Sequence, residues 1–219
     1  MRGVTKSIKS VVGLLAVNVA LATAAHAGTI PYPNAGSVNS TVYSFTAQTT
    51  GDVIAYFAGS TAAYDNQLGL LINGVLTPAG FGLDNHSSSI GQSFDFGQAK
   101  AGDSLVFVLN VASLGNQKIY SDPSMNTGYD DPSYTGSHNH VYSTSYTAGT
   151  GLGTDPSGTY VAFEDLPFPY SDFNYNDENF VFTNVNNDQN TVPEPSTALL
   201  LGAGLFGLGI AGRMKKKVS

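Results

Sequence analysis

Short runs of β-branched and aromatic residues alternate with clusters of Gly, Asn, Asp, Ser and Pro through most of the chain. Runs of this length, with apolar residues at alternate positions, are typical of β-strands. No stretch between the two ends of the chain has the apolar period of an amphipathic helix. The pattern predicts strands at residues 41–47, 52–57, 67–72, 75–77, 92–96, 104–111, 140–146, 159–163 and 180–185.

Turn signals between these runs predict how the strands are connected. Asn73-Gly74 separates two apolar runs, and this pair favours a type I′ hairpin because both of its positions need positive φ. Residues 50–52 and 101–103 also have the composition of turns that lead into strands. Many short strands at this spacing predict an all-β fold, an antiparallel β-sandwich or jelly roll, with a barrel as the alternative. Residues 119–158, rich in Ser, Asp, Tyr, Gly and Asn, predict functional loops at one end, interrupted by a short strand near Val141.

The first 27 residues have the three parts of a secretory signal peptide. Basic residues come before an apolar run at 11–22: Arg2, Lys6 and Lys9. The small residues Ala25 and Ala27 then form an Ala-x-Ala site, which predicts cleavage by signal peptidase before Gly28. A permanent membrane anchor is the alternative, but the run contains Asn18 and is shorter than the roughly 20 residues of a membrane span.

The last residues, 192–219, combine a proline motif, an apolar stretch and a basic tail. Pro193, Glu194 and Pro195 form a stiff, non-helical segment ahead of the apolar residues 196–212. The tail is basic at Arg213, Lys215, Lys216 and Lys217, which is typical of a segment retained on the cytoplasmic side of a membrane. An ordinary membrane anchor would not explain the Pro-Glu-Pro motif.

The segment VPEPSTALLLGAGLFGLGIAGRMKKK closely resembles the PEP-CTERM sorting signal, with its three parts in the same order. This resemblance implies transient anchoring in the inner membrane of a Gram-negative-type bacterium and processing there by an exosortase, a membrane cysteine protease-transpeptidase. Pro193, Glu194 and Pro195 would be the residues that this enzyme recognises. Proteins with such signals are commonly associated with exopolysaccharide, biofilm or floc matrix, so the expected destination is the cell surface or the extracellular matrix.

Removal of both ends would leave residues 28–191, a length that predicts one domain. The domain has no cysteine, so its stability must come from its core, hydrogen bonds or bound ions. The whole chain has a net charge of −7. Residues 28–191 contain 15 acidic residues and only two basic ones, Lys100 and Lys118, so their formal charge is −13. Such a domain would repel nucleic acid and anionic membranes and attract divalent cations.

The acidic residues are densest in the segment FEDLPFPYSDFNYNDENFVF, residues 163–182. Its candidate metal ligands all carry side-chain oxygens: Glu164, Asp165, Asp172, Asn174, Asn176 and Asp177. If residues 172–176 were extended, the polar side chains would alternate with Phe173 and Tyr175. Calcium prefers six to eight oxygen ligands, so this segment predicts a Ca²⁺ site. The alternative is that these side chains cap strands and form Asx turns without metal.

The calcium site is not predicted to be an EF-hand. The opening Asp172-x-Asn174-x-Asn176 is similar to an EF-hand loop, but Asp177 stands where the loop needs glycine. Thr183 occupies the position of the bidentate glutamate, and the predicted strands leave no flanking helices.

A second resemblance covers most of residues 39–185. The segments TYVAFEDLP and SDFNYNDENFVFTNV are similar to the C-terminal signature of an uncharacterised β-domain found in exported bacterial proteins, and DNQLGLLINGV, AGDSLVFVLNV and HNHVYST are similar to its earlier parts. The resemblance implies a role in ion binding for the acidic signature residues. Asn174 departs from the acidic pattern and would weaken a site that depends on charge.

Other chemistry has weaker support. His138 and His140 are spaced as strand-borne metal ligands can be, but a turn leading into a strand is the preferred interpretation. The chain has no Gly-x-Ser-x-Gly motif of a serine hydrolase. A glycosidase needs two carboxylates, and an acidic chain offers pairs such as Glu164 and Glu178. We therefore expect a non-enzymatic structural or adhesive protein. The alternative is a carbohydrate-binding module of the exopolysaccharide matrix that uses the tyrosines of the loop region: Tyr120, Tyr129, Tyr134 and Tyr142.

Overall fold

The computed structural model describes residues 29–150, 152 and 156–191. The predicted signal peptide with Ala25 and Ala27, and the predicted sorting residues Pro193, Glu194 and Pro195, lie outside these residues. Within the described ranges, no helix is both long enough and apolar enough to cross a membrane.

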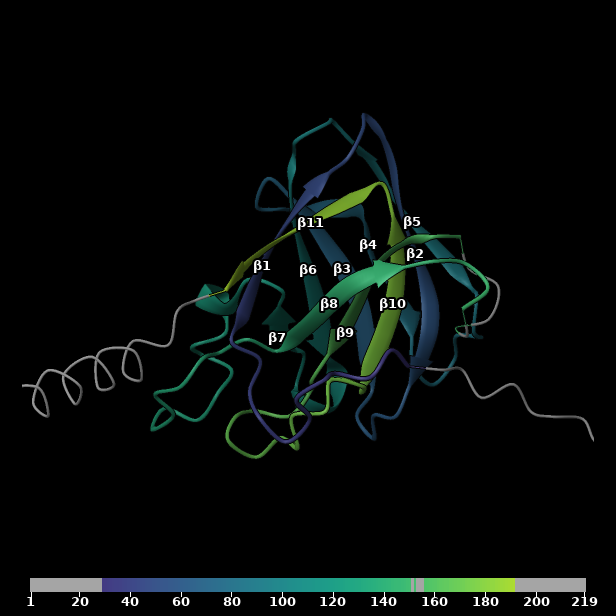
Figure 1. The fold of residues 1–219 in the computed structure, drawn as a ribbon. Coiled ribbons are helices and arrows are strands. Elements are labelled where there is room, and N and C mark those ends of the chain that lie inside the picture. Colours follow the sequence, from purple (N-terminus) through teal and green to yellow (C-terminus); the bar gives the residue numbers. More distant parts are fainter. Residues whose placement is uncertain (1–28, 151, 153–155, 192–219) are drawn as a thin grey trace, which may run out of the picture.

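The described residues form strands joined by turns and loops, with two short 3-10 helices (Figure 1). The strands are β1 (Thr41–Ala47), β2 (Gly51–Ser60), β3 (Asn66–Ile72), β4 (Val75–Asp84), β5 (Ser93–Ala99), β6 (Ser104–Val111), β7 (Gln117–Tyr120), β8 (Val141–Tyr146), β9 (Gly158–Phe163), β10 (Glu178–Thr183) and β11 (Val185–Thr191). The 3-10 helices are η1 (Ala112–Leu114) and η2 (Pro123–Met125).

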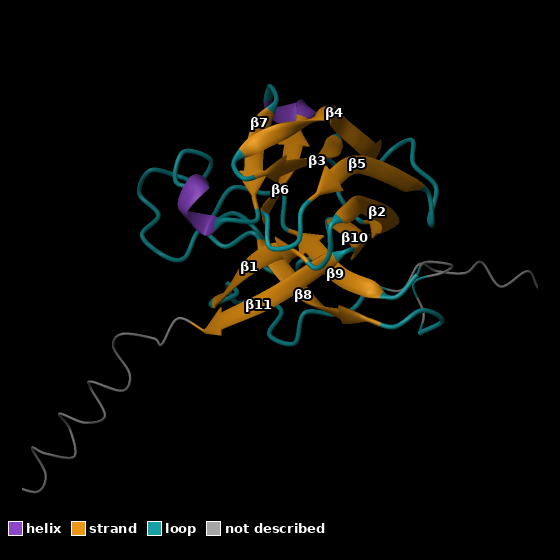
Figure 2. Ribbon diagram, turned by 90° about the horizontal axis from the view of Figure 1, so that it is seen from above, coloured by secondary structure: helices purple, strands orange, loops and turns teal. Residues whose placement is uncertain are grey.

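The strands form two antiparallel sheets that pack face to face, which confirms the predicted β-sandwich. The first sheet has the order β11-β1-β6-β3-β4, with β7 also paired to β6, and the second has the order β5-β2-β10-β9-β8. Seen from above in Figure 2, β4 lies beside β5, and β11 also contacts β9. The hydroxyl of Thr159 in β9 donates to the carbonyl of Val185 in β11 at 2.8 Å, so the sheets are joined at this edge.

The core lies between the sheets because apolar residues alternate along the strands and point inward. Phe107 of β6 stacks on Phe182 of β10, with ring centroids 4.0 Å apart, and thereby joins the two layers. Other large side chains in this layer are almost completely buried: Leu68, Leu70, Phe96, Leu105, Leu109, Phe163 and Phe180. Burial of aromatic and aliphatic area on this scale is the main stabilising contribution in a domain without disulfides.

A second apolar cluster covers the outer face of the second sheet. Tyr160 and Val181 point away from the core and pack with Tyr32 from the N-terminal segment and Tyr175 from the segment before β10. The Tyr32 and Tyr175 rings meet edge to face at 4.8 Å. Strands β9 and β10 are consequently buried on both faces, which explains the uninterrupted apolar runs at residues 160–163 of β9 and 180–182 of β10.

The Asn73-Gly74 hairpin is confirmed. Both residues have positive φ, 50° and 81°, and Ile72 pairs with Val75 across the turn. The opposite end of the sandwich contains the start of β3, the end of β9 and the start of β10. The loops that surround these strand ends bring the acidic residues together.

Candidate functional site

The acidic segment closes one end of the sandwich, between the last residue of β9 and the first residue of β10. Glu164 and Asp165 follow β9 directly, and Glu178 begins β10. Register pairs Glu178 with Phe163 and with Ser60, the last residue of β2. Antiparallel pairing therefore places these carboxyl groups at one end of the fold, although the segment between them loops outward.

Four carboxyl groups and one amide form a buried cluster, which we call the acidic cluster: Asn66, Glu164, Asp165, Asp177 and Glu178. Glu164 and Asp165 are 1% and 3% exposed, and Glu178 is completely buried. The Asn66 amide donates to Asp165 Oδ2 at 2.7 Å and to Glu178 Oε1 at 3.4 Å. Asp177 Oδ2 accepts from the backbone N–H of Asp165 at 2.9 Å, so the cluster is continuous.

The surroundings of the acidic cluster disfavour the ionised form of its four carboxyl groups. Burial, followed by the neighbouring charge of Asp177, raises the pKa of Asp165 to about 7. Burial and the charge of Glu164 likewise raise the pKa of Asp177 to about 7. Burial also raises the pKa of Glu164 and raises that of Glu178 well above its ordinary value. At neutral pH these groups therefore need either protons or a cation to balance them.

The remaining predicted ligands lie in the loop before β10 and are engaged in hydrogen bonds there. Asp172 is exposed, and its two carboxylate oxygens accept from the backbone N–H and the side-chain amide of Asn174. Asn174 Oδ1 in turn accepts from the N–H of Asn176 at 3.1 Å. Asn176 Oδ1 accepts from the hydroxyl of Thr61 at 2.5 Å. The first two contacts are successive Asx turns, as in the metal-free alternative for this segment, whereas the Asn176 contact joins the loop to the residue after β2.

The backbone of this loop is not extended, contrary to the expectation for residues 172–176. Phe173 and Tyr175 have φ of 55° and 53°, in the left-handed region. Asx turns tolerate this geometry because the preceding side chain replaces a backbone partner. The alternation of polar and apolar residues is nevertheless retained, since Tyr175 is buried while Asp172 is exposed.

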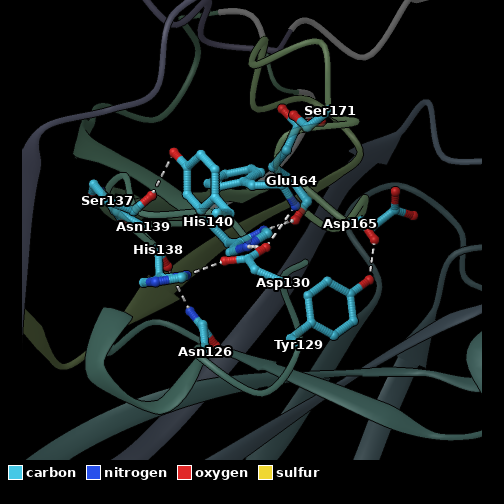
Figure 3. A network of polar contacts seen from close by, with 12 residues as sticks. Asn126, Tyr129, Asp130, Ser137, His138, Asn139, His140, Glu164, Asp165 and Ser171 are labelled. Carbon is cyan, nitrogen blue, oxygen red and sulfur yellow. Dashed lines mark hydrogen bonds and ion pairs between the residues drawn. The ribbon is translucent and has the colours of Figure 1, made fainter. Parts of the chain in front are cut away.

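A second polar network is centred on Asp130, beside the acidic cluster (Figure 3). Asp130 contacts His138 Nδ1 at 2.5 Å and His140 Nε2 at 3.0 Å, and it accepts from the N–H of Phe168 at 2.6 Å. His140 Nδ1 lies 2.8 Å from the carbonyl oxygen of Glu164, which connects the two networks. Burial alone would raise the pKa of Asp130, but hydrogen bonds led by His140 outweigh it and hold that pKa below its ordinary value.

The two histidines are thus engaged with a carboxylate at the entrance to β8, which agrees with their interpretation as residues of a turn before a strand. The His140 ring also stacks on Phe168, with centroids 3.9 Å apart. This arrangement fixes the loop between η2 and β8 against the acidic segment. Sequence spacing alone did not indicate Asp130 as their shared partner.

The tyrosines proposed as a sugar platform do not form one exposed surface. Tyr129 is 7% exposed, and its hydroxyl donates to the backbone carbonyl of Asp165. Tyr120, Tyr134 and Tyr142 are each partly buried. Glu164 and Glu178, the pair considered for glycosidase chemistry, are both buried, so neither is presented to a polysaccharide.

Among the residues that the structure places, no three His, Cys, Asp or Glu side chains are arranged to hold one metal ion. A cation site among these residues would combine fewer carboxylates with neutral oxygens. Asn66 and Ser60 provide such oxygens beside Glu178, and neither was among the predicted ligands. Asn66 is 99 positions from Asp165, and Ser60 is 118 positions from Glu178, so only the sheet pairing brings them together.

Comparison with known proteins identifies the end of the chain. The PEP-CTERM protein-sorting motif matches residues 191–216. No curated protein and no solved structure matches the chain. The match begins at Thr191, the last residue of β11, so the motif follows the sandwich directly. The chain therefore carries a PEP-CTERM protein-sorting motif, which implies processing by an exosortase and export toward the cell surface.

Proposed function

We propose that this chain is a non-enzymatic structural or adhesive component of the cell surface or extracellular matrix, stabilised by calcium at the acidic end of its sandwich. The sorting motif at residues 191–216 is the observation that carries the proposal. In this proposal the motif directs one compact β-domain to the outside of the cell, and the domain itself is the delivered product.

The form of the domain supports a structural role. Its side chains fill the space between the sheets, and aromatic residues cover part of the outer face as well. The carboxyl groups that could perform acid-base chemistry are mostly buried and bonded to backbone or amide groups. A catalytic acid or base must reach the proton that it transfers, and these groups are not positioned for that.

The charge of the domain supports the calcium part of the proposal. Fifteen acidic residues face two lysines between the processed ends, and four of the acidic residues belong to the acidic cluster. A domain of this charge is stabilised by cations that it binds only when folded. Calcium is the hard, oxygen-seeking cation that suits carboxylate and amide ligands in exported proteins.

A carbohydrate-binding module is the alternative, and it has less support. Stacking on sugars requires exposed aromatic faces, whereas Tyr129 is buried beneath the acidic segment. If the domain does bind exopolysaccharide, it would do so through a surface other than the one formed by these tyrosines.

Replacement of Pro193, Glu194 and Pro195 by alanine tests the proposed route. We expect the altered chain to accumulate in the inner membrane, with loss of most of the surface and extracellular fraction seen in quantitative immunoblots. The matched control is P132A, which changes an exposed proline of the domain and should leave the distribution unchanged. Normal surface delivery of the triple variant would refute exosortase-dependent sorting.

A further inference from the structure

The acidic cluster contains a contact between the two sheets that involves no core side chain. Asn66 begins β3 in the first sheet, and Glu178 begins β10 in the second. Both residues are completely buried. The side-chain nitrogen of Asn66 lies within hydrogen-bond distance of one oxygen of Asp165 and one oxygen of Glu178, at 2.7 and 3.4 Å. Two carboxyl groups thus approach the same point between the sheets.

Two buried oxygens at this contact have no partner in the part of the chain that the structure describes. They are Oδ1 of Asn66 and Oε2 of Glu178. Buried polar atoms are nearly always satisfied in folded proteins, and exceptions indicate a missing partner such as water or an ion. Here both unpaired atoms are oxygens, and both belong to residues that already surround one point. A cation among these carboxyl groups would provide a partner for such an oxygen and would also balance their charge.

The surrounding charge is also that of a cation site. Asp177 bonds to the backbone of Asp165, so a third carboxyl group lies next to the contact. Of the two lysines between the processed ends, Lys118 lies over the ring of Phe81, and Lys100 lies in the turn after β5. The ion pairs of the described residues all join Asp130 to a histidine. Neither lysine therefore forms an ion pair with a carboxyl group of the acidic cluster there.

We propose that Asn66, Asp165 and Glu178 bind one calcium ion that clamps the two sheets together. This inference rests on the calcium binding proposed above and names the residues responsible, which differ from the loop residues first expected. Half a turn of the Asn66 amide would direct Oδ1 between the two carboxylates, where Nδ2 now lies, and would place Nδ2 where Oδ1 is now unpaired. Glu178 would add its second oxygen, which is the bidentate mode that calcium accepts readily.

The clamp is consistent with the absence of a three-carboxylate site in the described residues, because it uses two carboxylates and one amide. Ser60 adds a hydroxyl oxygen 3.2 Å from Glu178 Oε1. Ser60 and Asn85 also line a hollow of about 600 Å³ at this end of the sandwich. The hollow borders the cluster, because Ser60 donates to Glu178 and Asn85 accepts from the backbone N–H of Asn66. Calcium commonly keeps water among its six to eight oxygens.

Calcium titration of the full chain in a non-ionic detergent tests the clamp. Thermal unfolding is recorded after EDTA treatment and then in increasing calcium chloride, and equilibrium dialysis gives the number of ions bound. We expect one calcium per chain, with an affinity of about 0.1–1 mM as in extracellular calcium modules, and a melting temperature that rises with calcium. E178Q should weaken binding by about tenfold or more, because it removes the charge without changing the side-chain shape.

D172N is the matched control, because it removes one carboxylate from the exposed loop. Its calcium affinity should stay within about twofold of that of the unchanged chain. Circular dichroism establishes that each variant is folded, and D165N replaces E178Q if the latter does not fold. The clamp is overturned if the folded chain binds no calcium, if E178Q binds normally, or if D172N alone abolishes binding. Surface delivery is measured separately in cells, so failure of the clamp leaves the sorting proposal intact.

Discussion

Asp130 is the residue on which the loops at the acidic end depend most strongly. Its side chain is buried and contacts two imidazole rings and one backbone N–H. These partners come from the loop before β8 and from the connection after β9, so one carboxylate holds two segments together. A buried charge of this kind is stable only while its partners are present.

The substitution D130N should destabilise the fold by about 3 kcal/mol, because an amide cannot replace the buried carboxylate in all of its contacts with the two imidazole rings and the N–H of Phe168. Chemical denaturation of both proteins at neutral pH measures the free energy of unfolding. D52N is the control, since Asp52 is exposed at the start of β2, and its effect should be within about 0.5 kcal/mol.

The difference in free energy of unfolding between D130N and the unchanged chain should depend on pH, and the direction of the change can be predicted. The pKa of Asp130 is lowered in the folded state, so its stabilisation is present above the unfolded carboxyl pKa of about 4. It is lost as the pH falls through the lower folded pKa. The difference in stability between D130N and the unchanged chain should therefore shrink in acid. An equal difference at pH values on both sides of that range would contradict the assigned role.

At this scale the sequence indicated the acidic segment but not the residues outside it that the fold brings to it. Residues 163–182 stand out because acidic and amide side chains follow one another closely. Asn66 and Asp130 carry no such signal, since short groups of polar residues are ordinary in turns and at strand ends. Their roles depend on which strand ends meet, and that is decided by long-range pairing.

At the scale of elements, most strands follow from alternation alone. β1 and β6 have the predicted bounds, because both combine regular burial with clear flanking turns. β11 was missed beyond its first residue, since its sequence VNNDQNT is polar and it lies at the edge of a sheet. β7 was missed because only Ile119 of its four residues is buried. β4 continues past Pro78 and Gly80, which normally indicate the end of a strand.

The hairpin between β3 and β4 allows a direct test of turn chemistry. G74A should destabilise the domain by about 1 kcal/mol, because Gly74 has φ of 81°, which residues with a Cβ rarely adopt. Gly128 is the matched control: it also has open space around it, but its φ is not in the positive range. G128A should be neutral to within about 0.5 kcal/mol in the same denaturation experiment. Equal effects at both positions would contradict the type I′ assignment.

At the scale of the whole molecule, the account joins a folded domain to a sorting signal. The motif matched at residues 191–216 begins where β11 ends, so few residues separate the sandwich from the Pro-Glu-Pro sequence. Seven of the nine basic residues lie in the two segments that processing would remove. Processing would therefore change a chain of net charge −7 into a domain of formal charge −13. Such a product suits a cation-rich surface or matrix.

The most direct test of this account is to determine both termini of the protein recovered from the cell surface or matrix by intact-mass and peptide mass spectrometry. The account predicts a chain that begins at Gly28 and ends close to Pro193–Pro195, without the basic residues from Arg213 onward. A surface protein that still carries Lys215, Lys216 and Lys217 would contradict it.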